Sequence, residues 1–500
     1  MGRIAVASAV VLWLIPISIL FNQIVPSPYM DEIFHVPQAQ QYCRGNFRSW
    51  DPMITTPPGL YFLSLAYIAS LFPGLFCMGA VSSFTDSCST SVLRLTNGVL
   101  AVLCSILVYE IIVHLRPSLD EKKATFQAVI LSLYPLHWFF TFLYYTDVAS
   151  LTAVLAMYLL ALKKKYLLSS LLGALSVLIR QTNIIWTLFV ACTSVIQFAE
   201  SHNKSGEEIK DLGTSMKNDD LSSSQDNVSV ATNLRKRRGN KVITSHKSFT
   251  PQTSVPMAHS SGLVDEILDI IVISWNHFWE IFVSLSPFFM VFVAFLGFVY
   301  WNGSIVLGAK DAHGVSLHFP QLLYFGLISA IFTAPVQFKK LLKRKLFGPV
   351  QLLVALAFGF LSVQFFSIAH PYLLADNRHY TFYLWRKVIN YHWSTKYIMI
   401  PLYVYSWFSI VNNLAKNQKK LWVLAYFFAC AASLVPAPLI EFRYYTIPFF
   451  FLVLHSNVTD SWSSVFTGIF YLAVNCFTMF MFLFRPFSWK HESGTQRFIW

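Results

Sequence analysis

The chain has 500 residues, of which 55% are hydrophobic, 17% aromatic and only 12% charged. Soluble domains carry about 25% charged residues, so this composition excludes an ordinary soluble protein and indicates a chain that crosses a membrane many times. The net charge is +13, but the basic residues gather in short loops between apolar segments, as orientation in a membrane requires, and no motif suggests a nucleic-acid partner.

The N-terminal segment predicts a first membrane span. Arg3 precedes about 20 apolar residues, enough to cross roughly 30 Å of hydrocarbon and too many for the core of a signal peptide. We therefore expect this span to be retained, with Arg3 in the cytosol. Residues 27–91 then form a first loop on the far side of the membrane.

The stretch "PYMDEIFHVPQAQQYC" at residues 28–43 places two acids and a histidine directly after this span. Ser27, just before the stretch, and Pro28 favour a helix that begins there, and Pro37 would end or kink it. In such a helix Asp31 and His35 share a face, whereas Glu32 points roughly 100° away. The two acids are therefore expected to have different roles. The simpler alternative is that both acids merely favour the helix N-terminus through its dipole.

The rest of this loop contains an apolar segment, residues 59–72, that follows two prolines. It is short for a span, so we expect a helix that lies at the membrane interface or dips into it. Cys43, Cys77 and Cys88 share the same loop, and they either include a disulfide or remain free thiols.

Downstream, apolar segments alternate with loops so that the basic loops face the cytosol, and we expect about 12 or 13 spans in all. Residues 124–145 cross outward, and two short spans meet at Arg180. Residues 199–262 are polar and predict a disordered cytosolic loop, followed by an amphipathic interfacial segment at 263–282. We divide the chain into an N-terminal transmembrane module at 1–198, this loop, and a C-terminal half at 263–500 with far-side loops at 301–318 and 370–395.

The far side keeps an unusual set of ionisable groups near the ends of spans, where charges are costly and often functional. They are Asp31, Glu32, His35, Asp51, Arg94, Asp147, Arg180, Asp311, His313, Asp376, Arg378, His379, Arg386, Glu441 and Arg443. The densest group lies in "DNRHYTFYLWRK", where far-side cations run against the positive-inside trend. They indicate an anionic partner, and phosphate suits an arginine fork. Of the Asn-x-Ser/Thr motifs, Asn302 alone faces the far side in this topology.

Eight segments carry a family resemblance: "PYMDEIFHVPQAQQYC", "WDPMITTPPGLYF", "VLRLTN", "YYTDVAS", "RQTNIIW", "WNGSIVLGAKDAHGVSLHFPQLLYF", "ADNRHYTFYLWRK" and "EFRYYTIPF". Together they resemble the dolichyl-phosphate-glucose-dependent α-1,2-glucosyltransferases of the eukaryotic endoplasmic reticulum. The resemblance covers nearly the whole chain outside residues 199–262. It implies an all-α bundle of the GT-C type with lumenal juxtamembrane helices, in the membrane of the endoplasmic reticulum.

The resemblance also implies the reaction. Glucose would pass from dolichyl phosphate glucose to the diglucosylated dolichol-diphosphate-linked oligosaccharide, as the terminal α-1,2-linked sugar of the N-glycan precursor. The donor glucose is β-linked in this family, so the reaction inverts. No cofactor and no metal are expected, because cationic side chains can hold the leaving phosphate. Membrane lipids are the surroundings of both substrates.

An inverting transfer needs one carboxylate that takes the proton of the acceptor hydroxyl. The resemblance gives this role to the first lumenal loop, with Asp31 as first choice and Glu32 as second. The donor phosphate is expected to be held by Arg378 with His379, then by Arg443 and Arg180. The other expected substrate contacts are His35, Asp147, Asp376 and Tyr380.

The alternative is a non-enzymatic polytopic membrane protein, such as a transporter or an ion-channel accessory subunit. A transporter should place its charges near the midplane of the membrane, on broken helices. Here the ionisable residues collect at one face, which favours an enzyme that works at the membrane interface.

Overall fold

The computed structural model describes residues 1–220, 262–310, 314–341, 348–456, 461–490 and 494–500. Within them the chain is helical, and its extended pairings are two isolated bridges, His379 with Ile499 and Phe487 with Gln496. The expected all-α polytopic architecture is confirmed. Asp311 and His313, two of the far-side ionisable residues, lie outside the described residues.

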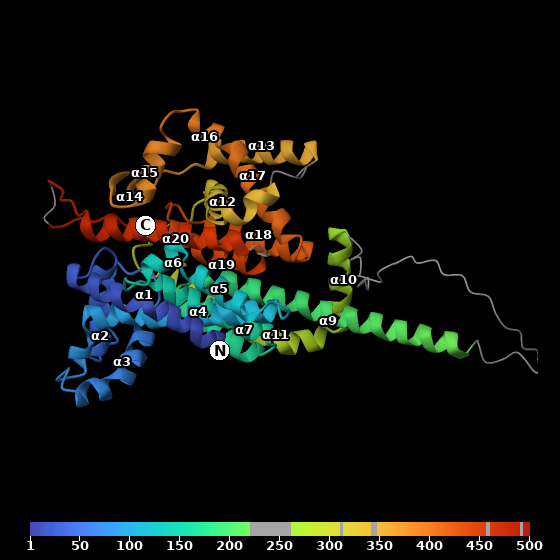
Figure 1. The fold of residues 1–500 in the computed structure, drawn as a ribbon, viewed down its shortest axis with the longest axis horizontal. Coiled ribbons are helices and arrows are strands. Elements are labelled where there is room, and N and C mark those ends of the chain that lie inside the picture. Colours follow the sequence, from blue (N-terminus) through green and yellow to red (C-terminus); the bar gives the residue numbers. More distant parts are fainter. Residues whose placement is uncertain (221–261, 311–313, 342–347, 457–460, 491–493) are drawn as a thin grey trace, which may run out of the picture. The chain divides into compact units, whose positions relative to one another are not determined.

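Figure 1 shows the helices in chain order. Their bounds are α1 Gly2–Ile24, α2 Glu32–Cys43, α3 Gly59–Cys77, α4 Thr90–Leu115, α5 Glu121–Ser132, α6 Pro135–Phe140, α7 Thr146–Leu162, α8 Tyr166–Ile179, α9 Asn183–Asp220, α10 Leu263–Asn276, α11 Phe278–Asn302, α12 Pro320–Leu341, α13 Pro349–Phe366, α14 Pro371–Ala375, α15 Tyr380–Leu384, α16 Thr395–Ile398, α17 Ile400–Leu414, α18 Lys420–Leu434, α19 Thr446–His455 and α20 Ser461–Phe484. A π turn at Trp385–Ile389 and 3-10 turns at Thr85–Cys88 and Phe442–Tyr445 join them.

Seven of the described helices are long and apolar enough to cross a membrane: α1, α3, α4, α11, α13, Asn183–His202 of α9 and Trp462–Phe484 of α20. Shorter apolar helices accompany them, namely α7, α8, α18 and Pro320–Ala334 of α12. Against the 12 or 13 expected spans, the described residues thus show seven helices of full spanning length and four shorter apolar ones. Residues 124–145 split into α5 and α6 because Pro135, which has no amide hydrogen, begins a new helix.

Two boundaries differ from expectation in the first loop. Helix α2 begins at Glu32, not at Ser27, because Met30 has a φ of 56°, a left-handed conformation that interrupts a helix. It then continues through Pro37 to Cys43. Helix α3 continues through Pro73 to Cys77, so it is longer than the expected interfacial segment.

The chain divides into two compact units, residues 1–194 together with 278–500, and residues 195–277. Most of the predicted N-terminal module and most of the predicted C-terminal half therefore belong to one unit, which contains all the candidate site residues. Of the predicted polar loop at 199–262, residues 221–261 lie outside the described part of the chain.

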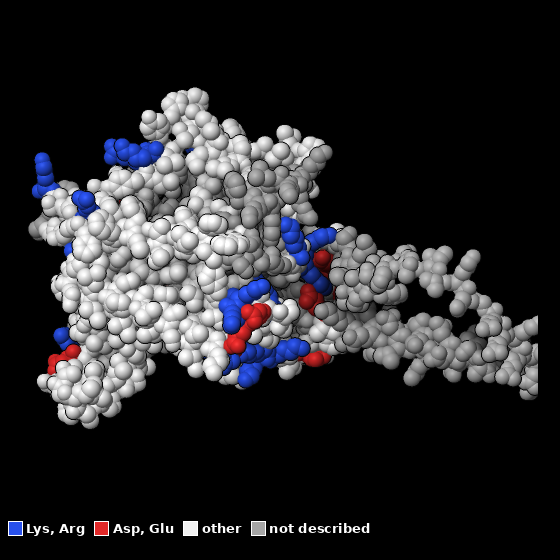
Figure 2. All heavy atoms as spheres, in the orientation of Figure 1, with Lys and Arg blue, Asp and Glu red and all other residues white. Residues whose placement is uncertain are grey.

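Charged side chains are unevenly distributed over the surface of the larger unit. On the face drawn in Figure 2, lysine, arginine, aspartate and glutamate gather toward two ends of the helical bundle, and a wide band between them carries none. This is the distribution expected where the middle of a bundle lies in hydrocarbon. The site is built at one of these ends, where α1 finishes and α4 and α7 begin.

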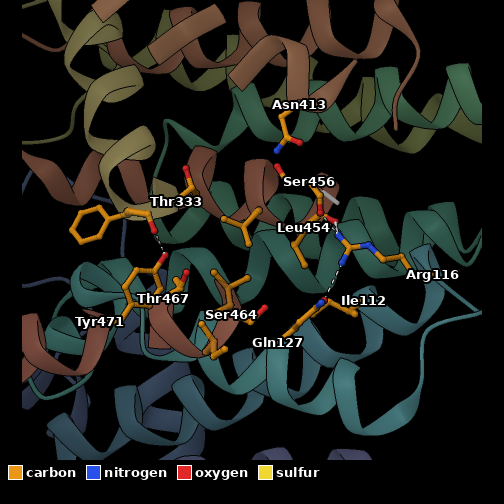
Figure 3. Close-up of a pocket in the computed structure, with 14 residues that line it drawn as sticks. Ile112, Arg116, Gln127, Thr333, Asn413, Leu454, Ser456, Ser464, Thr467 and Tyr471 are labelled. Carbon is orange, nitrogen blue, oxygen red and sulfur yellow. Dashed lines mark hydrogen bonds between the residues drawn. The ribbon is translucent and has the colours of Figure 1, made fainter. Parts of the chain in front are cut away.

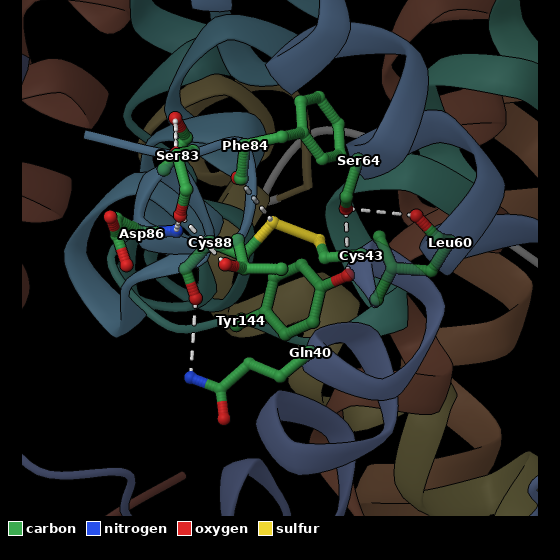
Figure 4. The surroundings of a disulfide bond; sticks show 11 residues. Gln40, Cys43, Leu60, Ser64, Ser83, Phe84, Asp86, Cys88 and Tyr144 are labelled. Atoms are coloured by element: carbon green, nitrogen blue, oxygen red, sulfur yellow. Dashed lines mark hydrogen bonds between the residues drawn. A yellow bond between two sulfur atoms is a disulfide. The ribbon is translucent and has the colours of Figure 1, made fainter. Parts of the chain in front are cut away.

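A disulfide joins Cys43 at the end of α2 to Cys88, just before α4, with 6.6 Å between the two Cα atoms (Figure 4). The carbonyl of Cys88 also accepts a hydrogen bond of 3.2 Å from Nε2 of Gln40. Cys77 is free and exposed. Of the two alternatives for this loop, the structure therefore supports the disulfide, and it ties α2 to the start of α4.

Candidate active site

Glu32 forms a fully buried ion pair with Arg94 of α4. The exposed fractions of the two residues are 0% and 2%. Arg94 donates from Nε to Oε1 at 2.9 Å and from Nη2 to Oε2 at 2.6 Å. Both oxygens also accept backbone bonds, from Tyr144 at 2.6 Å and from Tyr29 at 3.0 Å. A buried ion pair is tolerated when the hydrogen-bonding capacity of its groups is satisfied in this way. Glu32 therefore connects the first loop to α4 and to the turn before α7.

Asp31 has the opposite environment. It is the residue immediately before α2, and 39% of its side chain is open to solvent. Its Oδ2 accepts a hydrogen bond of 2.8 Å from Nη1 of Arg443, whose Nε donates to Glu441. Displacement of water by the surrounding protein raises the pKa of Asp31, but the charge and hydrogen bond of Arg443 lower it more, so the net pKa is below its ordinary value. Asp31 is therefore an ionised acid that remains accessible.

A second ion pair extends this cluster. Nη1 of Arg180, in the turn between α8 and α9, donates to Oδ1 of Asp147 at 2.7 Å. The guanidinium of Arg180 lies 5.6 Å from the ring centre of Tyr444, and that of Arg443 lies 6.0 Å from the same ring. Oδ2 of Asp147 is buried with no hydrogen-bond partner in the structure, so this carboxylate has an unused acceptor.

The turn that precedes α7 is held in place by an asparagine. Nδ2 of Asn97 donates to the carbonyls of Leu143 at 2.7 Å and Tyr145 at 2.8 Å. The hydroxyl of Tyr145 in turn accepts a bond of 3.0 Å from the amide of Asp31, and its ring lies 5.6 Å from the guanidinium of Arg443. Tyr145 therefore contacts both Asp31 and Arg443.

His35 lies one helical turn after Asp31. Its Nδ1 is 2.6 Å from the hydroxyl of Tyr61, and its ring centre is 6.4 Å from that of Tyr145. Burial lowers the pKa of His35 to about 4, despite the charge of Asp31, which acts in the other direction. The imidazole is therefore neutral at neutral pH, and it can exchange hydrogen bonds with a sugar hydroxyl without adding charge to the site.

The segment "DNRHY" forms a second group. Asp376 accepts from Nε of Arg378 at 2.8 Å and from Nη2 at 2.7 Å, while Nη1 donates to Gln496 at 3.0 Å. Water displacement raises the pKa of Asp376, but the Arg378 bond and the nearby His379 lower it more. Much of the charge of Arg378 is therefore offset within this group.

The two groups are connected through one aromatic ring. The ring of Trp500 lies 5.1 Å from that of Tyr380 and 6.0 Å from that of Phe442, the neighbour of Arg443. Asp31, His35, Asp147, Arg180 and Arg443 thus form one cluster, and Asp376, Arg378, His379 and Tyr380 form the adjoining group. Glu32 points away from both.

The described acids of the cluster are each paired with an arginine. The cluster combines an accessible carboxylate with two arginines at the edge of the apolar bundle. Chemically, it can accept a proton and stabilise a developing anion nearby.

A cavity at the other end of the larger unit is a different feature. It has a volume of about 60 Å³ and lies among α4, α5, α12, α17, α19 and α20 (Figure 3). Arg116, the one charged residue among the described lining residues, donates to the carbonyls of Leu454 at 2.7 Å and Ser456 at 2.6 Å and to Gln127 at 3.0 Å. None of the described residues that line this cavity is an acid, so none of them can serve there as a general base.

Sequence reasoning missed several residues that shape the site. Tyr145, Tyr444 and Tyr61 had no assigned role, and Arg94 and Glu441 were noted for their charge alone. The tyrosine doublets next to Asp147 and Arg443 were a usable signal, because aromatic rings often lie over arginine. Residues 496–500 carried no signal that linked them to the site.

The chain resembles known proteins over nearly its whole length. A model of the DIE2/ALG10 family matches residues 25–454. A protein of Arabidopsis thaliana named "Dol-P-Glc:Glc(2)Man(9)GlcNAc(2)-PP-Dol alpha-1,2-glucosyltransferase" is 57% identical over 515 residues, with 100% of both chains covered. Relatives of the same name in Mus musculus and Yarrowia lipolytica are 33% identical and are covered over 94% of their length by 96% of this chain. No solved structure matches the chain.

Proposed function

Because this chain belongs to the DIE2/ALG10 family, we propose that it is the membrane glucosyltransferase that its relatives are named for. It transfers glucose from dolichyl phosphate glucose to the diglucosylated dolichol-diphosphate oligosaccharide and forms an α-1,2 linkage. The shared name of relatives from a plant, a mammal and a yeast supports the donor, the acceptor and the linkage. The transporter or accessory-subunit alternative has no support among these relatives.

Asp31 is the general base in this proposal. The acceptor hydroxyl gives its proton to Asp31 while its oxygen attacks the anomeric carbon of glucose, and the bond from that carbon to the phosphate oxygen breaks. The electron pair of that bond stays on dolichyl phosphate, which gains one negative charge. Glu32 cannot take the proton, because it is buried and its oxygens are bonded to Arg94 and the backbone.

Arg443 links the two charge changes of this step. Before transfer its Nη1 is bonded to the ionised Asp31 at 2.8 Å. Protonation of Asp31 removes that negative charge at the moment when the leaving phosphate gains one, so Arg443 can stabilise the phosphate instead. Arg180 supports the same change from its position beside the ring of Tyr444. Arg378 and His379 then serve the outer side of the phosphate site, as the adjoining group.

The observation that carries the proposal is the contrast between two adjacent acids in a chain of this family. Asp31 is accessible and paired with a cation of another segment, whereas Glu32 is sealed in the bundle. A base must reach its substrate, so accessibility with a retained negative charge distinguishes Asp31.

The function is tested in microsomes from cells that lack the endogenous enzyme, supplied with labelled dolichyl phosphate glucose and the diglucosylated acceptor. The wild-type chain should add one glucose. Asp31→Asn keeps the shape of the side chain but not its basicity, so transfer should fall by about 100-fold or more. Asp86→Asn, a change at an exposed acid of the same loop, is the matched control and should leave the rate unchanged. Transfer by Asp31→Asn at more than half the wild-type rate, at equal abundance, would remove Asp31 from the mechanism.

We further infer that the enzyme lies in the membrane of the endoplasmic reticulum with its site facing the lumen. The Cys43–Cys88 disulfide shares a loop with Asp31, and disulfides persist in oxidising compartments such as this lumen. Arg3 and Lys163 both form ion pairs with Glu110. These three residues lie at the ends of α1, α4 and α7 that are farthest from the site. Basic residues at the end away from the site agree with a cytosolic position for that end.

A further inference from the structure

The chain's last described residues, 494–500, fold back from α20 onto the site. Phe487 and Gln496 exchange two backbone hydrogen bonds, of 2.9 Å and 2.7 Å, which turn the chain after α20. Arg497 then donates from Nη1 to the carbonyls of Phe482 at 2.8 Å and Leu483 at 3.0 Å, so it caps the end of that helix. Figure 1 shows the C mark near α14 and α20.

This returning segment, residues 495–500, is bonded along its length to the loop of Arg378. The amide of Ile499 donates to the carbonyl of Arg378 at 2.9 Å, and the amide of Tyr380 donates to the carbonyl of Ile499 at 3.0 Å. Nδ1 of His379 lies 3.1 Å from the backbone oxygen of Trp500. Gln496 holds the guanidinium of Arg378 at 3.0 Å.

The other side of the returning segment meets the loop of Asp31. The hydroxyl of Tyr29, two residues before Asp31, donates to the carbonyl of Arg497 and accepts from its amide, both at 2.7 Å. Ile499, which is 1% exposed, packs in the same apolar cluster as Tyr29. Burial raises the pKa of Tyr29 to about 12, so its hydroxyl remains a donor across the physiological range.

A third contact reaches the segment of Arg443. The ring of Trp500 lies 6.0 Å from Phe442, the residue before Arg443, and 5.1 Å from Tyr380. The returning segment therefore touches three loops that are more than 50 residues apart in sequence. They carry the proposed base, its cation and the outer phosphate-binding group.

We propose that residues 495–500 are a positioning segment for the donor: they hold the loops of Asp31, Arg378 and Arg443 in one arrangement around the departing phosphate. The inference rests on the proposed function. None of these residues is assigned a chemical step. Their effect is geometric, and small displacements of catalytic groups are costly in such sites.

The test uses the full chain in microsomes and measures the KM of each substrate separately. Tyr29→Phe keeps the buried ring and removes the hydroxyl that holds Arg497. We expect it to raise the KM for dolichyl phosphate glucose about tenfold, as the loss of one or two neutral hydrogen bonds allows, with the KM for the acceptor oligosaccharide unchanged. Tyr300→Phe, at a tyrosine that is 92% exposed, is the matched control and should change neither.

A chain that ends after Gly494 should show a larger increase in the KM for dolichyl phosphate glucose, again with the KM for the acceptor unchanged. A purely structural role would instead lower the abundance of the enzyme while both KM values stay at wild type. An unchanged donor KM in Tyr29→Phe overturns the proposal, whatever the shortened chain does. Failure of the wild-type chain to transfer glucose at all would count against the proposed function, so the two failures are distinguishable.

Discussion

At the scale of single residues, Arg443 controls the charge of the proposed base. The pKa of Asp31 is held below its ordinary value against the effect of water displacement, and the opposing influence is the guanidinium of Arg443. A carboxylate with a depressed pKa is ionised above that pKa, and its contribution is lost as the pH falls through it. In Arg443→Gln the pKa of Asp31 should rise. In a plot of transfer rate against pH, the acidic limb, where the rate falls as Asp31 is protonated, should therefore move to higher pH.

The limb is measured by initial rates between about pH 4 and about pH 8, each variant normalised to its own plateau, because loss of Arg443 also lowers the plateau itself. His35 should not add a second limb near neutrality, since its pKa is about 4 in the folded enzyme. Arg44→Gln, at an exposed arginine after α2, serves as control. A limb in Arg443→Gln at the wild-type pH would show that Arg443 does not set the charge of Asp31.

The sequence could predict that Asp31 and Glu32 differ, because adjacent helical residues point in different directions. It could not assign the roles, since the partner of Glu32 is Arg94, 62 residues away, and that of Asp31 is Arg443, 412 residues away. Arg94 did offer a hint. An arginine within the apolar run that became α4 needs an acid to be buried with it.

At the scale of elements, the position of α2 depends on the Cys43–Cys88 disulfide. This bond closes a loop over 45 residues of sequence separation and fixes the end of the helix that starts beside Asp31. By the loop-entropy argument, Cys88→Ser should lower the free energy of unfolding by about 2–4 kcal/mol. The change should appear as a lower thermal midpoint of the purified enzyme in detergent.

Reduction provides the internal check of that prediction. A thiol reductant should lower the midpoint of the wild-type enzyme toward that of Cys88→Ser and leave the variant where it is. Cys77→Ser, at the exposed free cysteine of the same loop, should behave as wild type. Equal midpoints for wild type and Cys88→Ser in oxidising buffer would mean that the bond does not hold α2 in place.

The helical character of the apolar segments and their approximate positions could be predicted from the sequence. The points at which a segment breaks into two helices could not. Pro135 divides an apolar run into α5 and α6, whereas Pro37 and Pro73 lie inside α2 and α3 without ending them. The outcome depends on the tertiary contacts around each proline as well as on the proline itself. In α2, Gln38 bonds to Ser49 and Asp51 of the following loop, a contact that no local pattern reveals.

At the scale of the whole molecule, the orientation of the chain in the membrane was predicted from the basic loops. The helix bundle adds a second argument. The site lies at one end of α1, α4 and α7, and the basic residues Arg3 and Lys163 with Glu110 lie at the other end. The position of the returning segment, residues 495–500, was not predictable, since nothing in "TQRFIW" indicates which loops it will contact. Its placement comes from packing across segments hundreds of residues apart.

Orientation can be tested with glycosylation. Asn302 lies in the one natural acceptor motif expected to face the lumen, but its Nδ2 donates to the carbonyls of Ser304 at 2.8 Å and Val306 at 2.7 Å. An amide engaged in this way is not presented for modification, so the wild-type chain should carry no N-glycan. Asn390 is exposed in the loop at 370–395, which is expected to face the lumen, and His392→Thr makes it an acceptor. That variant should gain one glycan, seen as a mobility shift that a glycosidase removes.

Each alternative outcome has a separate meaning. A glycan on the wild-type chain that Asn302→Gln abolishes would show that the loop opens, while the orientation stands. A glycan that disappears in Asn203→Gln or Asn227→Gln, within the polar segment expected to be cytosolic, would invert the orientation. Asp31 would then face the cytosol, where its loop would lose the oxidising environment that a Cys43–Cys88 bond requires. The lumenal proposal therefore requires that His392→Thr gains a glycan and that Asn203 and Asn227 carry none.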